Sequence, residues 1–187
     1  MDGETDEAIA LRVQAGDGDA FGTLIERYQA KLMRYARKFL LDPDDATDIV
    51  QDIFIKSYQN IQSFDASRRF SPWVYRIAHN EFVNALKKRI SRRTVFTIDF
   101  DTLFPHLVAP DTSDSAAMER DTRAALDQYL DQVGPKYREP LVLYYLEGMD
   151  YKEISEILQI PVSTVGVRLA RGRAALQKIA AAQPLYE

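Results

Sequence analysis

Apolar side chains recur at intervals of three and four residues through the first half of the chain, which is the spacing of one buried helix face. This spacing predicts a helix over residues 19–41. Asp42 and Pro43 supply an N-cap and a first-turn proline for a second long helix. Ser71 and Pro72 repeat this start signal, and the third helix ends in the basic run KKRISRR. The first half is therefore predicted to consist of long helices.

The helical period is lost over residues 94–115, where prolines and aspartates alternate with large apolar side chains. We predict that this segment is an interdomain linker. The period then resumes, and a short apolar helix over residues 141–146 is expected to end at Gly148. No β-strand pattern of any length is present in the sequence. The expected fold class is all-α, with two small helical domains over residues 1–93 and 116–187.

Residues 148–176 carry the pattern of a helix-turn-helix. Asp150 and Glu153 can form a capping box at the start of its first helix, and residues 159–161 interrupt that helix. Ser163 is expected to cap the second helix. The basic side chains that would then face solvent or DNA are Arg168, Arg171 and Arg173. The alternative is an ordinary helical hairpin with a solvated basic face.

Charge is distributed unevenly along the chain. The net charge of −4 would by itself count against a nucleic-acid binder. Residues 68–93, however, hold eight basic side chains against Glu81 alone, and residues 162–182 hold four basic side chains and no acidic one. Acidic side chains gather instead near the start of the chain and around residues 42–52. The two separated basic stretches predict two contacts with DNA.

The composition argues against several kinds of site. There are no cysteines, and His79 and His106 are too few for a histidine-rich site, so we expect no metal and no cofactor. No phosphate-cradling glycine loop or nucleophile motif is present, so an enzyme is not expected. No apolar run approaches the roughly 20 residues of a membrane-spanning helix, and the acidic start is unlike a signal peptide. We expect a cytoplasmic protein without membrane insertion.

The first half carries a more specific pattern. The segment DATDIVQDIFIKSYQNIQSF is followed, after a short basic loop, by FSPWVYRIAHNEFVNALKKR. Together with the helix-turn-helix, these segments resemble the extracytoplasmic-function (ECF, group 4) RNA polymerase sigma factors over nearly the whole chain. The resemblance implies a region 2 domain over residues 1–93 for polymerase docking and for recognition and melting of the minus ten element. It also implies a region 4 domain over residues 116–187 for the minus 35 element.

The resemblance implies partners and roles for individual residues. The expected partners are core RNA polymerase, through its β′ coiled coil and β flap, promoter DNA and an anti-sigma factor. The polymerase-binding residues would be Asp48, Gln51 and Asp52. The minus ten residues would be Phe64, Arg68, Arg69, Phe70, Arg76, Asn80, Lys87, Lys88, Arg89, Arg92 and Arg93. The minus 35 residues would be Ser163, Thr164, Gly166, Val167, Arg168, Arg171 and Arg173. For the polymerase set, a merely solvated acidic face is the alternative.

These roles agree with simple physical chemistry. Stacking and backbone charge can capture unpaired bases with about 1–3 kcal/mol per base and no nucleotide hydrolysis. The expected recognition helix departs from the family pattern, because small side chains stand at Gly166, Val167 and Ala170 and Gln159 replaces a turn glycine. Our hypothesis is that Gly166 lets the backbone approach DNA closely. A stand-alone helix-turn-helix regulator, with a sensing or dimerising first half, is the alternative function.

Overall fold

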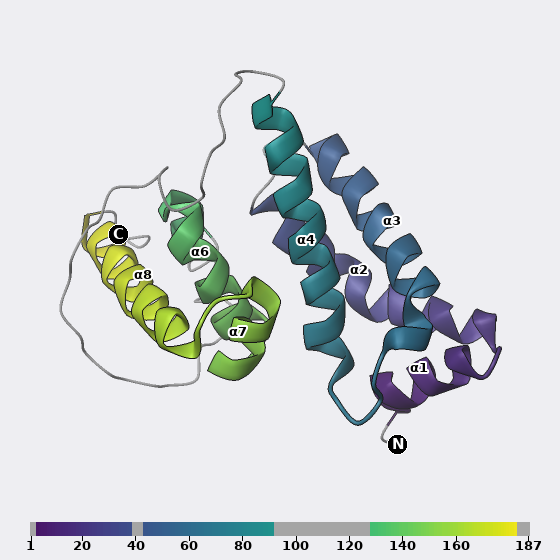
Figure 1. Cartoon of the computed structure of the whole chain (residues 1–187). Coiled ribbons are helices and arrows are strands. Elements are labelled where there is room, and N and C mark those ends of the chain that lie inside the picture. Colours follow the sequence, from purple (N-terminus) through teal and green to yellow (C-terminus); the bar gives the residue numbers. More distant parts are fainter. Residues whose placement is uncertain (1–2, 39–42, 92–127, 183–187) are drawn as a thin grey trace. The chain divides into compact units, whose positions relative to one another are not determined.

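The computed structural model describes residues 3–38, 43–91 and 128–182, which form helices and the turns between them (Figure 1). No strand occurs in these three ranges, and the predicted all-α fold class is confirmed. The chain divides into two compact units, Met1–Val95 and Phe96–Glu187. Each unit has its own buried core, as two small helical domains require.

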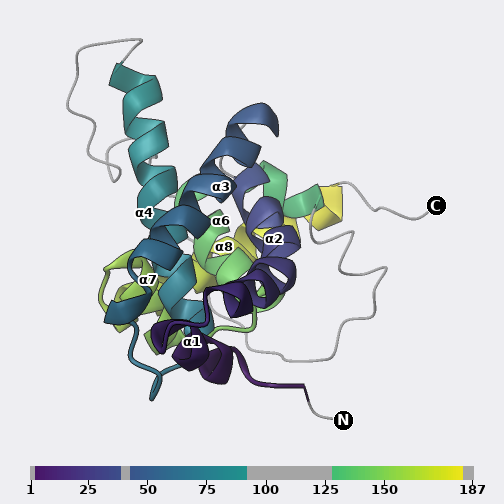
Figure 2. The ribbon, with the colours of Figure 1, turned by 90° about the vertical axis from the view of Figure 1, so that its right-hand side faces the viewer.

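The first unit is a bundle in which three helices lie side by side (Figures 1 and 2). They are α2 (Phe21–Arg37), α3 (Pro43–Gln59) and α4 (Phe70–Ser91). All three contribute large side chains that are at most 2% exposed: Tyr28, Tyr35, Ile53, Tyr75 and Phe82. Burial of such aromatic and aliphatic side chains is the main stabilising term of a small bundle.

The helix predicted over residues 19–41 is confirmed as far as Arg37. It opens with a 3-10 turn, η1 (Gly18–Ala20), in which the Asp17 side chain accepts a hydrogen bond from the Ala20 N–H. The last residues of the predicted helix and the predicted N-cap Asp42 lie outside the described residues.

The sequence analysis missed a short helix, α1 (Asp6–Gln14). The Thr5 side chain caps it by accepting a hydrogen bond from the Ala8 N–H. Ile9, Ala10 and Val13 are its buried residues. Nine residues give fewer than three turns, so the apolar period is too short to stand out within an acidic segment.

The predicted start of α4 was wrong by a small shift, since the helix begins at Phe70 and not after a Ser71 cap. The Phe70 N–H donates to the Glu7 carboxylate of α1 at 2.9 Å. Pro72 still lies in the first turn, where its missing N–H costs nothing. The N–H group at the start of α4 is thus bound by a residue of α1, whereas the sequence predicted a local cap by Ser71.

The second unit begins, within the described residues, with helical residues 128–132. It continues with α6 (Pro135–Leu141), a π-helical segment labelled η3 (Val142–Leu146), α7 (Tyr151–Leu158) and α8 (Val162–Ala182). The short apolar helix predicted over residues 141–146 is therefore the end of α6 plus the π turn. Pro140 lies just before this turn and has no N–H for a regular helix bond. The predicted linker lies outside the described residues.

Gly172 lets α6 and α8 approach closely. A Cβ at this position would lie 2.8 Å from Leu141 Cδ1 and 3.3 Å from the Tyr137 backbone oxygen. Both Gly172 and Leu141 are buried. The absence of a side chain at Gly172 is thus a packing requirement of this helix pair.

The predicted helix-turn-helix is present as α7 and α8. The Asp150–Glu153 capping box is confirmed, with the two reciprocal bonds at 2.8 and 2.9 Å. Gln159 ends α7 in the left-handed conformation, with φ 54°. The expectation that Ser163 caps α8 was wrong, because the helix already begins at Val162. The Pro161 carbonyl accepts the first helical hydrogen bonds, so Ser163 lies inside the first turn.

Candidate functional site

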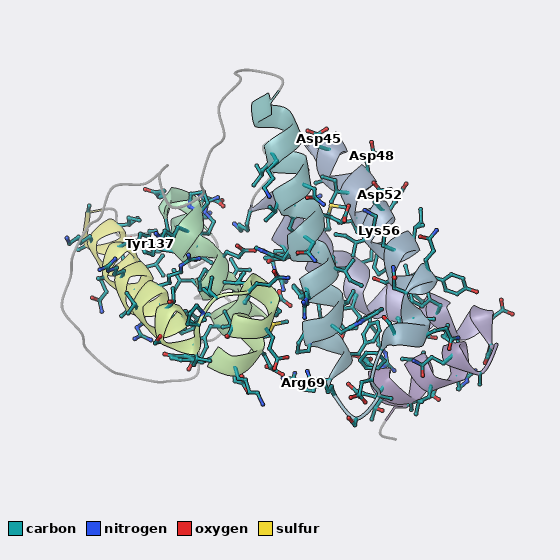
Figure 3. All side chains as sticks on the ribbon, in the orientation of Figure 1. Asp45, Asp48, Asp52, Lys56, Arg69 and Tyr137 are labelled. Carbon is teal, nitrogen blue, oxygen red and sulfur yellow. The ribbon has the colours of Figure 1, made fainter. Side chains whose placement is uncertain are left out.

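The polymerase-binding residues predicted on α3 lie on an exposed face. Asp48, Gln51 and Asp52 are exposed, and so is Asp45, which the predicted set left out. Figure 3 shows the three aspartates along one side of α3. The helix turns Ile53 inward to the core. The acidic row, defined as Asp45, Asp48, Gln51 and Asp52, offers acceptors to a basic partner surface.

An apolar groove lies beside the acidic row, between α2 and α3. Its volume is about 360 Å³. Its lining residues are Ile25, Gln29, Met33, Thr47, Val50, Gln51, Phe54 and Ile55. Ile55 is 54% exposed although it is large and apolar. Because Gln51 belongs to both the row and the groove, this face combines acidic and apolar chemistry, as protein interfaces commonly do. The sequence analysis did not predict the groove.

The predicted minus ten loop begins and ends on buried aromatic rings. Phe64 is 5% exposed and Phe70 is 1% exposed. Their ring centroids are 5.3 Å apart, and each lies 5.4 Å from the half-buried Trp73 ring. Both rings are covered by the core in this structure, and their predicted contact with minus ten DNA stays a prediction. They anchor the two ends of the loop.

The basic loop, defined as residues 65–69, is exposed along most of its length. The Asp65 carboxylate accepts hydrogen bonds from the Ser67 hydroxyl at 2.7 Å and from the Ser67 N–H at 3.0 Å. These bonds, the hydroxyl first, hold the pKa of Asp65 below its ordinary value. These bonds form a local turn within the loop. Arg68 and Arg69 are exposed at its end, and Figure 3 labels Arg69.

One face of α4 continues this basic surface. Arg76, Asn80 and Lys87 are exposed and follow helical spacing. Asn84 is exposed on the same face and was not predicted, although its spacing from Asn80 could have indicated it. The one acid of the basic stretch, Glu81, forms an ion pair with Lys56 of α3, so its charge is compensated.

The remaining predicted minus ten residues are only partly covered by the structure. The side chains of Lys88 and Arg89 lie outside the described residues, as do Arg92 and Arg93 entirely. Their proposed phosphate contacts stay a prediction.

The start of α8 presents small and apolar side chains. Val162 is 47% exposed and Val167 is 49% exposed, with Ser163 also exposed. Val165 and Leu169 are fully buried. The remaining predicted residues are partly exposed, and they are Thr164, Gly166, Arg168 and Arg171. An added Cβ at Gly166 would meet only the Tyr151 ring, at 3.7 Å, so packing does not require this glycine.

Arg173 differs from the other predicted arginines. Burial lowers the pKa of its guanidinium, but hydrogen bonds to the Tyr145 and Tyr151 side chains outweigh burial and raise it. Those two rings flank Tyr144, with centroids 4.9 and 5.6 Å from it. Arg173 is therefore engaged by its own domain, a tertiary relation that the basic pattern of the sequence did not reveal.

The two halves of the chain match two consecutive protein families. Sigma-70 region 2 matches residues 24–92, and Sigma-70 region 4 matches residues 123–176. The chain is similar to the ECF RNA polymerase sigma factor SigW of Bacillus subtilis, with 34% identity over 89% of this chain and 92% of that protein. The chain belongs to the ECF sigma factors. The RNA polymerase sigma-H factor of Pseudomonas aeruginosa is 35% identical to this sigma factor over 97% of this chain and 96% of that protein.

Solved structures agree with this membership. This sigma factor is similar to CnrH, solved in complex with the cytosolic domain of CnrY, with TM-score 0.68, 26% identity and coverage of 96% of this chain and 99% of that chain. It shares its fold with the sigma factor RpoE of Bartonella quintana, solved with the anti-sigma factor NepR, at TM-score 0.65 and 23% identity. The coverage is 86% of this chain and 96% of that chain. None of the described helices is long and apolar enough to cross a membrane.

Proposed function

We propose that this ECF sigma factor uses three separate surfaces to direct core RNA polymerase to its promoters. The main observation that supports this proposal is the separation of acidic and basic side chains within the first unit. The acidic row of α3 and the basic loop lie at opposite ends of that domain, as Asp45, Asp48 and Arg69 show in Figure 3. A protein that must bind both a polymerase and a polyanion needs two such surfaces, because like charge on one face would repel one partner.

The acidic row and the adjoining groove are proposed as the polymerase surface. Asp48, Gln51 and Asp52 offer exposed acceptors for a basic coiled coil such as that of β′. Ile55 and the groove supply apolar area that would be removed from water in the complex. Charge here guides the encounter, and the apolar groove slows dissociation.

The basic loop and the exposed face of α4 are proposed as the minus ten surface. Arg68, Arg69 and Arg76 offer cationic groups to the DNA backbone, while the Asn80 amide can read a base edge. Lys87 extends this face, and the predicted contacts of Lys88, Arg89, Arg92 and Arg93 would lengthen it further. No nucleotide hydrolysis is needed, because captured bases supply the binding energy for strand separation.

The start of α8 is proposed as the minus 35 surface. Ser163 and Thr164 lie in the first turn, where their hydroxyl groups and the partial positive charge of the helix start favour phosphate. Arg168 and Arg171 add basic charge further along the helix. The exposed Val167 would contribute an apolar contact, of the kind that thymine methyl groups accept.

Several wider properties belong to the same proposal. The boundaries 1–93, 94–115 and 116–187 delimit the two DNA-binding domains and the linker. The protein acts in the cytoplasm, without catalysis and without a cofactor. An anti-sigma factor holds it inactive, a proposal supported by family membership and by CnrH, whose complex with a cytosolic domain shows a relative engaged by a second protein.

The test is run-off transcription from genomic promoter fragments with bacterial core polymerase. The intact protein is expected to give new specific start sites, and alanine at Asp48, Gln51 and Asp52 together is expected to abolish them. Glu26→Ala, an exposed acid on the neighbouring helix α2, is the matched control and should keep them. Binding of DNA without any programming of core polymerase would instead support the stand-alone regulator.

A further inference from the structure

Helix α1 contacts both ends of the segment that carries the basic loop. The Gln14 side-chain amide donates to the Ile61 carbonyl at 2.7 Å and to the Phe64 carbonyl at 2.8 Å. Ile61 begins the 3-10 turn η2 (Ile61–Ser63) that leads into the loop. The Gln62 side chain returns a hydrogen bond to the Gln14 carbonyl at 3.0 Å. One glutamine of α1 therefore fixes the chain immediately before the loop.

The other end of the loop is held from the same helix. The Glu7 carboxylate accepts the Phe70 N–H, which is the first N–H of α4. A helix start has N–H groups without intrahelical partners and a partial positive charge, so a carboxylate there is favourable. Glu7 thus fixes the chain immediately after the loop.

Helix α1 is itself firmly attached to the bundle. The Asp6 carboxylate binds Arg27 at 2.5 Å and accepts the Tyr28 hydroxyl hydrogen bond at 2.6 Å. Burial, followed by the hydrogen bond to Asp6, raises the pKa of Tyr28, so its hydroxyl stays a donor. Ile9 and Val13 are buried against the core. A helix held this way can transmit its position to the loop ends.

The loop between these two ends has little packing of its own. Residues 65–69 include no buried side chain, and the bonds within the loop include those of Asp65 with Ser67, of the Arg68 N–H with the Asp65 carbonyl and of the Arg68 guanidinium with the Asp65 carboxylate. A loop without buried side chains loses conformational freedom when it binds. Fixing its two ends beforehand lowers that cost.

We propose that Glu7 and Gln14 are positioning residues that hold the basic loop in the geometry in which Arg68 and Arg69 meet promoter DNA. The inference rests on the proposed minus ten role of this loop. It assigns a function to α1, whose residues precede the matched Sigma-70 region 2 segment, residues 24–92.

The test compares variants of the full chain assembled with core polymerase. Gln14→Met removes both amide hydrogen bonds at similar size, and Glu7→Leu removes the acceptor of the Phe70 N–H. Glu7→Gln keeps an acceptor oxygen and is the conservative rescue. Leu11→Ala is the control, because Leu11 is 52% exposed on the same helix.

The probe is a promoter fragment found by run-off transcription, prepared with its minus ten non-template bases unpaired. Gln14→Met and Glu7→Leu are each expected to weaken its binding about tenfold, the scale of one or two lost hydrogen bonds. Binding to core polymerase should stay within about twofold of the parent protein on the same scale. The Arg68 and Phe70 amides should also exchange faster with solvent, while Glu7→Gln and Leu11→Ala behave like the parent.

Unchanged probe binding with unchanged amide exchange would overturn the proposal. An equal loss of probe and core binding would overturn it as well, because it would indicate a general loss of structure. If Gln14→Met does not fold, the pair Glu7→Leu and Glu7→Gln decides the question. Arg68→Ala with Arg69→Ala tests the minus ten role separately, since that role fails if this variant binds the probe normally whatever α1 does.

Discussion

Two glycines of the same helix illustrate how differently one residue type can act. Gly172 faces Leu141 at a distance that leaves no room for a Cβ, whereas Gly166 faces only the Tyr151 ring at ordinary contact distance. The sequence shows two glycines in a helical pattern and cannot separate these environments. Gly166 is therefore the one left to explain by function.

Gly172→Ala is expected to destabilise the protein by about 1–3 kcal/mol, because the new methyl group overpacks the α6–α8 contact. Gly166→Ala is expected to stabilise it by up to about 1 kcal/mol, because alanine favours the helix. Urea unfolding measures both. A destabilised Gly166→Ala variant would show that packing requires this glycine too.

The same Gly166→Ala variant tests the close approach of the backbone to DNA. If the α8 backbone lies against DNA there, the variant should bind duplex promoter DNA more weakly in the polymerase complex although it is the more stable protein. Unchanged promoter affinity would remove the hypothesis. Stability and affinity move in opposite directions only if the glycine serves binding.

The hydrogen bonds to the Asp65 carboxylate should make the stability of the basic loop depend on pH. Its pKa is lowered by hydrogen bonds from Ser67, so the folded loop favours the carboxylate. The associated stabilisation is present above the ordinary aspartate pKa of 3.8 and is lost as the pH falls through the lower folded value. Titration by NMR should place Asp65 below 3.8, and Ser67→Ala should move it back up. An unshifted Asp65 in the parent protein would contradict the loop geometry.

At the scale of elements, the conformation at the two ends of α7 determines the turn of the helix-turn-helix. Gln159 adopts φ 54° at the end of α7, a conformation that is costly for a residue with a side chain. The turn nevertheless forms, because α7 is capped at Asp150 and buries Ile154 and Ile157. The packing of α7 and α8 on either side of Gln159 thus offsets the cost of its left-handed backbone.

Gln159→Gly is expected to stabilise the protein by about 0.5–1 kcal/mol, since glycine adopts the left-handed conformation without steric cost. Gln177→Gly, at an exposed position within α8, is the matched control and is expected to destabilise by about 1 kcal/mol. Thermal unfolding distinguishes the two. Equal effects of both substitutions would contradict the left-handed turn.

At the scale of the whole molecule, the two proposed DNA surfaces lie on separate compact units. Lys87→Ala and Arg171→Ala should each reduce the slope of log affinity against log salt by about 0.9, the value for one phosphate contact. The double variant should show the sum, because the two residues belong to separate units, and substitutions at sites that share no partners usually add. Salt titration of promoter binding by the polymerase complex measures the slopes. An unchanged slope for either single variant would remove that residue from the phosphate contacts.

The sequence alone determined the helical class, the capping box of α7 and the inward stripes of the long helices. These features arise from interactions between residues three and four positions apart. A sequence pattern therefore predicts them without knowledge of the tertiary structure. The motif order also indicated the family, which the comparisons confirm. The separation of acidic and basic stretches could likewise be read directly along the chain.

Only the tertiary structure decided which residues of these stretches face solvent. It buried Phe64 and Phe70, engaged Arg173 with Tyr145 and Tyr151, and revealed the groove beside α3. It also showed that the first N–H of α4, that of Phe70, donates to the carboxylate of Glu7, 63 residues away. Such contacts join groups far apart in sequence, and a local pattern carries no information on distant partners. The fold thereby converts a basic segment into an exposed loop with two anchored ends.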